Sequence, residues 1–189
     1  MTKLFPLPLF LLPGGRAKLR IFEPRYLRLV RECSANQQGF VLAMMQGKRL
    51  YRYGTLVDIV DFETLPDGLL GITIAGRQRV KIQSTEQEAD KLWVGEIQAL
   101  NDWPHDEFID QEENEEKMRI AAGLKNVFAA HPDHAEQYEA PYFEDLTWSC
   151  QRWLEILPLS SAQKQWFIAQ ESAEEAMQFI SQLLEQEVE

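Results

Sequence analysis

The sequence predicts an α+β protein in which a β-rich first part is followed by a helical second part. Between residues 36 and 100, short apolar or Val/Ile-rich runs alternate with Gly, Pro and Asp turn signals, which is typical of strands and hairpins. The later apolar residues recur at helical spacing. Residues 1–100 carry 14 Lys and Arg against 10 Asp and Glu (+4), whereas residues 101–189 carry 5 against 20 (−15). We therefore expect two domains, residues 1–104 and 105–189.

The first 35 residues predict two strands and a helix. Prolines interrupt the apolar run of residues 4–13, and because proline donates no ladder hydrogen bond, this strand should pair only partly or at a sheet edge. A Gly14-Gly15 turn and a second strand up to Phe22 follow. Pro24 suits the first position of a helix, whose apolar side would be formed by Tyr26, Leu27, Val30 and Cys33.

Four further segments predict the remaining strands. Residues 40–45 form a continuous apolar run, which indicates a strand buried on both faces. The hairpin signal Pro66-Asp67-Gly68 separates residues 55–62 from residues 69–75, and Gly76 marks an expected bulge or bend. Residues 93–97 complete the set. About six short strands with little helix predict a small, partly closed barrel.

The second part predicts an acidic segment and then several helices. Residues 106–116 suggest a solvated linker or the first turn of a helix. Pro158 should end one helix, and Ser160 and Ser172 should begin two more through capping boxes with Gln163 and Glu175. The apolar stripes are Ile120, Leu124, Val127 and Phe128; Leu146, Cys150, Trp153, Leu154 and Leu157; and Ala173, Ala176, Met177, Ile180, Leu183 and Leu184.

Three segments, in this order, resemble the Lon N-terminal domain, also called the LON substrate-binding domain. They are residues 4–26 (LFPLPLFLLPGGRAKLRIFEPRY), Asp67-Gly68 with residues 71–82 (GITIAGRQRVKI), and residues 153–159 (WLEILPL) with Lys164-Gln165. The resemblance implies a PUA-like β pseudobarrel followed by a helical bundle. It also implies a bacterial protein that binds other polypeptides. The ATPase and peptidase modules that follow this domain in Lon have no counterpart here, so we expect a stand-alone member of the family.

The motif residues of this resemblance are expected to be mainly structural. Pro24 starts the helix, Glu23 lies where a carboxylate favours the helix N-terminus, and Tyr26 is expected to be buried. The full set is Phe22, Glu23, Pro24, Arg25, Tyr26, Asp67, Gly68 and Gly76.

The search for catalytic or metal chemistry predicts no enzyme, no cofactor and no metal. Gly47-Lys48 is followed by Arg49 and lacks the glycine that a phosphate-binding loop needs at position 42. His131 and His134 could ligate a metal, but Pro132 favours a polar loop. Acid–base chemistry would need buried carboxylates, whereas a solvated face is the simpler interpretation of Asp102, Asp106, Glu107, Asp110, Glu112, Glu113, Glu115 and Glu116.

Other function classes remain as alternatives. An RNA-binding PUA-like protein would use the basic clusters of the first half, although the acidic second half would repel the polymer; a small hydrolase would need a converging pocket of titratable groups. No apolar run approaches the roughly 20 residues of a membrane helix. Cys33 and Cys150 stand far apart, which favours a reducing cytoplasm. The basic residues are Arg16, Lys18, Arg20, Arg25, Arg28, Arg31, Arg77, Arg79 and Lys81.

The expected partners are unfolded or extended polypeptides, with a protease or chaperone as a further candidate, and neither a membrane nor nucleic acid. We expect weak binding in a cleft between the two halves. Two bare glycines would let another backbone approach the turn, an exposed Trp would anchor a client, and the acidic half would favour basic segments at low salt. The candidate residues are Pro13, Gly14, Gly15, Arg16, Arg77, Arg79 and Trp103.

Overall fold

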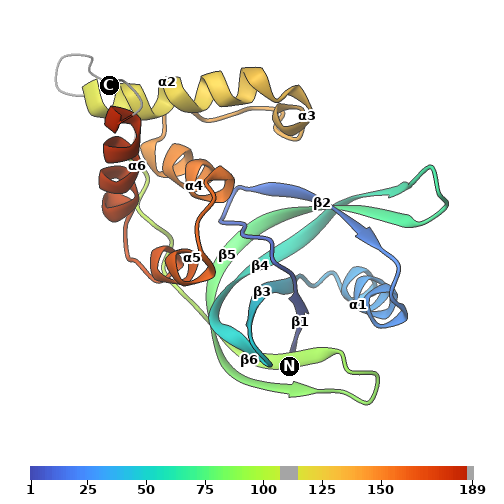
Figure 1. The fold of residues 1–189 in the computed structure, drawn as a ribbon. Coiled ribbons are helices and arrows are strands. Elements are labelled where there is room, and N and C mark those ends of the chain that lie inside the picture. The colour runs from blue at the N-terminus through green and yellow to red at the C-terminus, as the bar shows by residue number, and fades with distance from the viewer. Residues whose placement is uncertain (107–114, 187–189) are drawn as a thin grey trace. The chain divides into compact units, whose positions relative to one another are not determined.

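The computed structural model describes residues 1–106 and 115–186, and the chain divides into two compact units, Met1–Asn101 and Asp102–Glu189 (Figure 1). The first unit contains all of the described strands and one helix, and the second contains the remaining described helices. The predicted α+β class, with strands first and helices after them, is confirmed.

One closed sheet builds the first unit. Its strands are β1 (Thr2–Pro6), β2 (Arg16–Ile21), β3 (Phe40–Gln46), β4 (Arg49–Thr64), β5 (Leu70–Gln87) and β6 (Trp93–Ala99), in the order β2-β5-β4-β3-β1-β6. Because β5 also pairs with β6, the sheet closes into a barrel, and β2 lies outside the closed ring. Helix α1 (Pro24–Ala35) begins at Pro24, as predicted.

The apolar run of β3 serves two cores, which explains why it does not alternate with polar residues. Phe40 and Leu42 belong to a cluster with α1, whereas Val41 and Ala43 face the other cluster of the barrel. Successive strand residues point to opposite faces, so a strand buried on both sides must be apolar throughout. Helix α1 contributes Tyr26, Leu29, Val30 and Cys33, with Leu29 rather than the predicted Leu27 fully buried.

The first strand differs from the prediction in its place and its length. β1 is not an edge strand, because it pairs with β3 in parallel and with β6 antiparallel. The expected partial pairing is confirmed, since each ladder spans only three residues and the strand ends at Pro6. Residues 7–13 form no strand, although Phe10, Leu11 and Leu12 are buried.

Strands β4 and β5 are much longer than predicted, at 16 and 18 residues. Their ladder shifts register between Leu56 and Val57, which pair with Gln78 and Gly76. Arg77 is therefore the extra residue of a bulge beside Gly76, where the sequence predicted an irregularity.

The described residues of the second unit form five helices: α2 (Glu115–Ala130), α3 (Pro132–Ala135), α4 (Leu146–Ile156), α5 (Ser161–Ile168) and α6 (Glu174–Gln186). The capping box of Ser160 with Gln163 is confirmed. The predicted cap of α6 at Ser172 is one residue too early, because the helix begins at Glu174; Ser172 Oγ accepts from the Glu174 N–H at 3.4 Å. Pro132 begins α3 rather than excluding a helix.

Only part of the acidic segment can be compared with its prediction. Glu107, Asp110, Glu112 and Glu113 lie outside the described residues, whereas Glu115 and Glu116 form the first turn of α2, where carboxylates favour the helix dipole. Within the described chain, no helix is both long and apolar enough to span a membrane.

Candidate functional site

The predicted glycine turn is already in contact with the chain's own backbone. Gly14, at φ 81°, donates its N–H to the Gly76 carbonyl at 2.9 Å, and the Gly76 N–H donates to the Gly15 carbonyl at 2.8 Å. A Cβ on Gly76 would lie 2.1 Å from the Leu12 carbonyl oxygen. The close approach that the bare turn permits is therefore used by β5 itself, and that side of the turn cannot receive another chain.

Two further predicted residues lie in the interior. Arg79 is 1% exposed and donates through Nη2 to the carbonyl of Asn101. Trp103 is 3% exposed, and its indole N–H donates to the Gln170 carbonyl at 2.8 Å. Neither side chain offers a surface to a ligand, so we do not include them in the candidate site.

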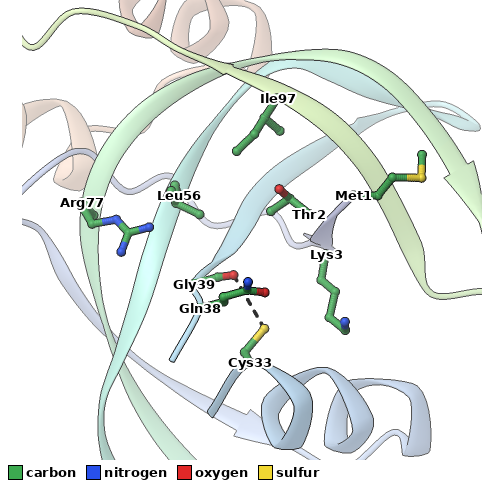
Figure 2. A pocket seen from close by; sticks show the side chains of 9 residues that line it. All are labelled: Met1, Thr2, Lys3, Cys33, Gln38, Gly39, Leu56, Arg77 and Ile97. Atoms are coloured by element: carbon green, nitrogen blue, oxygen red, sulfur yellow. Dashed lines mark hydrogen bonds between the residues drawn. The ribbon is translucent and has the colours of Figure 1, made fainter. Parts of the chain in front are cut away.

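Arg77 lines a small pocket of about 250 Å³ at the base of β1 (Figure 2). Figure 2 shows Arg77 and Lys3 on opposite sides, with Gln38 between them. Arg77 pairs with Asp58 at 2.8 Å and Lys3 pairs with Glu32 at 2.6 Å, so both cations are matched. Burial raises the pKa of the Cys33 thiol, which stays protonated at neutral pH and is a poor nucleophile.

The histidine cluster forms part of an aromatic group. The His134 ring lies 5.2 Å from that of Phe128 and 5.6 Å from that of Tyr138, and burial lowers its pKa. Over residues 1–106 and 115–186, no three His, Cys, Asp or Glu side chains converge as metal ligands. The arrangement gives no reason to assign a metal there.

The Phe22 pocket, a hollow of about 380 Å³ in the first unit, combines exposed apolar groups with cations. It is lined by Phe5, Pro6, Leu7, Arg20, Phe22, Glu23, Arg25, Tyr26, Met45 and Trp93. Phe22 is 61% exposed and Met45 is 39% exposed. Such large apolar side chains gathered at one exposed hollow are typical of a binding surface.

Local structure explains why Phe22 points outward. Ile21, the last residue of β2, is buried, and the next side chain along an extended backbone points to the opposite face. Pro24 then starts α1 at once, so Phe22 has no helix turn in which to bury itself. On β3, the buried run ends at Met44, and a register shift between Ala43 and Met45 turns Met45 to the surface.

The polar residues of the pocket are held firmly. The Arg25 guanidinium lies 4.8 Å from the centre of the Tyr26 ring, and its Nε donates to Glu23 at 2.9 Å. Burial raises the pKa of Tyr26, whose ring lies 4.0 Å from that of Phe5. These contacts give Glu23, Arg25 and Tyr26 packing and pairing roles, whereas the exposure of Phe22 speaks against a packing role.

Strand β2 leads into the Phe22 pocket with one edge unpaired. It pairs with β5 from Arg16 to Ile21, and no other described strand pairs with it. Its inner side chains join the core, while Lys18 and Arg20 point outward near Glu63 (3.9 Å) and Asp67 (2.5 Å). Because Arg20 also lines the pocket, strand β2 ends at the pocket.

Sequence reasoning missed Leu7, Met45 and Trp93, which come from three different elements or connections. Only Met45 carried a local signal, since a large apolar residue at the end of a buried strand is followed at once by Gln46 and a Gly47 turn.

Comparison with protein families gives one match over most of the chain. Residues 2–186 match the family described as the ATP-dependent protease La (LON) substrate-binding domain. The chain belongs to this LON substrate-binding domain family. Curated protein sequences gave no match.

Solved LON-domain structures agree with this assignment. A Lon N-terminal domain protein from Xanthomonas campestris is 28% identical, with a TM-score of 0.75 over 95% of both chains. The N-terminal domain of a Mycobacterium avium complex Lon protease shares the fold, with a TM-score of 0.64 over 97% of both chains at 14% identity.

Proposed function

We propose that this LON-domain protein binds extended segments of unfolded polypeptides and performs no catalysis of its own. The observation that carries the proposal is the exposure of Phe22 beside Met45 and Trp93, at the end of the unpaired edge of β2. The family description, a substrate-binding domain of a protease, agrees with a polypeptide ligand.

The geometry supports recognition by strand addition. An extended client would pair its backbone with the free edge of β2, which recognises main chain independently of sequence, and would place one apolar side chain in the Phe22 pocket. If the β2 edges of two molecules paired, Lys18 and Arg20 of one molecule would lie near the same cations of the other. This repulsion disfavours self-association, whereas a client segment without cations at these positions would not be repelled.

Binding at this site should be weak. Burying one large apolar side chain contributes roughly 1.5–3 kcal/mol, and each net hydrogen bond adds about 1 kcal/mol. Because association entropy opposes these gains, we expect dissociation constants on the order of micromolar to millimolar. Such affinity suits a protein that samples unfolded chains.

Two exposed phenylalanines provide a matched test. Phe22→Ser removes the pocket anchor, whereas Phe62→Ser removes a side chain that is 52% exposed on β4 and does not line the pocket. Fluorescence anisotropy of labelled, carboxymethylated α-lactalbumin should show binding weakened roughly tenfold or more by Phe22→Ser. Phe62→Ser should bind like the wild type.

A peptide experiment separates strand addition from simple apolar contact. Methylation of alternate backbone nitrogens on the bonded edge of a short client peptide should abolish its binding, while methylation of the other set should not, because only one edge of the peptide faces β2. Equal binding of both methylated peptides would reject strand addition. Equal loss in the two Phe→Ser variants would remove the Phe22 pocket from the site.

Neither rival class gains a specific observation. Four of the basic residues in β2 and α1 that would serve RNA, Lys18, Arg20, Arg25 and Arg28, are matched by carboxylates. Arg28 alone pairs with Glu32, Glu88 and Asp90. We expect the purified chain neither to hydrolyse ATP nor to cleave casein. ATP turnover that disappears on a point mutation in this chain would overturn the non-catalytic proposal. A cytoplasmic location stays a prediction, with which the two free cysteines agree.

A further inference from the structure

The second unit carries another apolar hollow, which is lined only by residues of that unit. The α6 groove, as we name it, has a volume of about 510 Å³ and is lined by Trp153, Leu157, Pro158, Leu159, Gln163, Phe179, Ile180, Leu183, Leu184 and Gln186. Its volume lies in the range of roughly 300–1,000 Å³ that is usual for ligand sites. All of these lining residues are uncharged.

Helix ends in the sequence create this groove. Pro158 prevents α4 from continuing, so Leu157 takes an extended backbone with ψ 143°, and Ser160 caps the next helix at once. The short connection leaves Leu157 and Leu159 only half-buried. On α6, Phe179 and Leu183 lie four residues apart beside the buried Ile180 and are also half-buried, so they extend the apolar stripe to the surface.

The groove lies in an electrostatic environment that favours cations. Leu157 caps the C-terminus of α4. A helix C-terminus carries a partial negative charge, and α4 has no basic residue in its last turn to compensate that charge. Residues 101–189 also have a net charge of −15, so an anionic ligand would be repelled.

We propose that the α6 groove is a second polypeptide site, and that its ligand is an apolar, leucine-containing segment flanked by Lys or Arg. The apolar side chains would enter the groove, and a flanking cation would lie at the uncompensated C-terminus of α4. This inference rests on the proposed polypeptide-binding function but uses other residues. In the Phe22 pocket, Arg20 and Arg25 are already paired with Asp67 and Glu23, so only the α6 groove should distinguish Lys flanks from Glu flanks.

Three labelled peptides test the ligand chemistry. One has a Leu-rich centre with Lys flanks, the second keeps the centre but has Glu flanks, and the third keeps the Lys flanks around a Ser-rich centre. The first peptide should bind the full-length protein best in fluorescence anisotropy at low salt. Its advantage over the second should shrink when salt is raised, because exposed charges are screened. Equal binding of the first and second peptides at low salt, or of the first and third, would overturn the proposal.

Variants on α6 test the location. Leu183→Gln should weaken the Lys-flanked peptide at least fivefold, whereas Met177→Gln, on the same helix but outside the groove, should not. Gln186→Lys places a cation at the rim of the groove without removing a buried group, so it stays informative if Leu183→Gln fails to fold. It should weaken the Lys-flanked peptide by roughly two- to fivefold, which corresponds to the usual strength of an interaction between exposed charges. Unchanged binding in Gln186→Lys would reject the site.

A comparison with Phe22→Ser separates this inference from the function proposed above. If Phe22→Ser leaves binding of the Lys-flanked peptide intact while Leu183→Gln abolishes it, the α6 groove is an independent site. This conclusion would hold even if binding of carboxymethylated α-lactalbumin turned out not to depend on Phe22. If Phe22→Ser abolishes binding of the Lys-flanked peptide and Leu183→Gln does not, the ligand lies at the first unit and the inference is wrong.

Discussion

Replacing Gly76 by alanine should lower the free energy of unfolding, because Gly76 lies directly against the glycine turn. In Gly76→Ala, the new Cβ would lie 2.1 Å from the Leu12 carbonyl oxygen and 2.9 Å from its carbon. Both are backbone atoms, so no side-chain rotation relieves the contact. Because non-bonded heavy atoms prefer separations of roughly 3.5–4.0 Å, the turn must move by about 1 Å or more.

The expected cost follows from what that movement breaks. The hydrogen bonds from Gly14 to Gly76 and from Gly76 to Gly15 measure 2.9 and 2.8 Å. Their loss costs about 2 kcal/mol together, and displacement of the packed backbone adds roughly 1–3 kcal/mol. We therefore expect Gly76→Ala to lower the free energy of unfolding by about 3–5 kcal/mol.

Gly71→Ala, five residues earlier on β5, is the matched control. Its Cβ would meet the side-chain atoms Glu63 Cγ at 2.6 Å and Leu65 Cδ2 at 3.0 Å, which can rotate away. Its effect should stay within about 1 kcal/mol. Urea titration followed by far-ultraviolet circular dichroism measures both variants, and hydrogen exchange should show lost protection at the Gly14 amide in Gly76→Ala alone. Equal destabilisation of the two variants would refute the argument.

Three further predictions concern packing, capping and pH. Tyr26→Ala should lower the free energy of unfolding by about 3 kcal/mol in urea titration, because its buried ring packs on the barrel core. Asp145→Ala should cost about 2 kcal/mol and Ser160→Ala about 1 kcal/mol by the same measurement, since Asp145 is fully buried and accepts three backbone N–H groups while Ser160 is an exposed cap. Hydrogen bonds from Arg28 hold the pKa of Asp90 below its ordinary 3.8, so this stabilisation is present above 3.8 and is lost as pH falls through the lower folded-state value. Arg28→Gln should therefore flatten the acid limb of a stability–pH profile, and an unchanged limb would contradict the pairing.

Local patterns predicted those parts of the fold that depend on local physics. The continuous apolar run of β3, the proline at the start of α1 and the capping box at Ser160 each follow from a few neighbouring residues. The place of β1 does not, because its parallel partner β3 lies more than thirty residues away in sequence. Prolines limited how much β1 could pair, but only tertiary structure determined with which strands.

The candidate site shows the same limit. The alternation of buried Ile21 and exposed Phe22 is a local property of an extended chain, so the sequence could have indicated that Phe22 faces outward. Its neighbours Met45 and Trp93 are brought there by the closed barrel. For Trp103 the sequence predicted an exposed side chain on a connector, but the side chain is buried. Its indole N–H donates to the Gln170 carbonyl, a contact between residues far apart in sequence that no local pattern indicates.

Two weak sites, of which only the α6 groove favours basic flanks, would together explain how such a protein distinguishes unfolded from folded clients. A folded client buries its apolar segments and pairs its strand edges, so it offers neither site a ligand. An unfolded client exposes many apolar segments, some with basic flanks and some without, and two engaged segments raise the overall affinity through their effective concentration. An unfolded chain that carries both kinds of segment should therefore bind more tightly than either peptide alone. This gain should be lost in Phe22→Ser and in Leu183→Gln alike, because either change leaves one site to act alone.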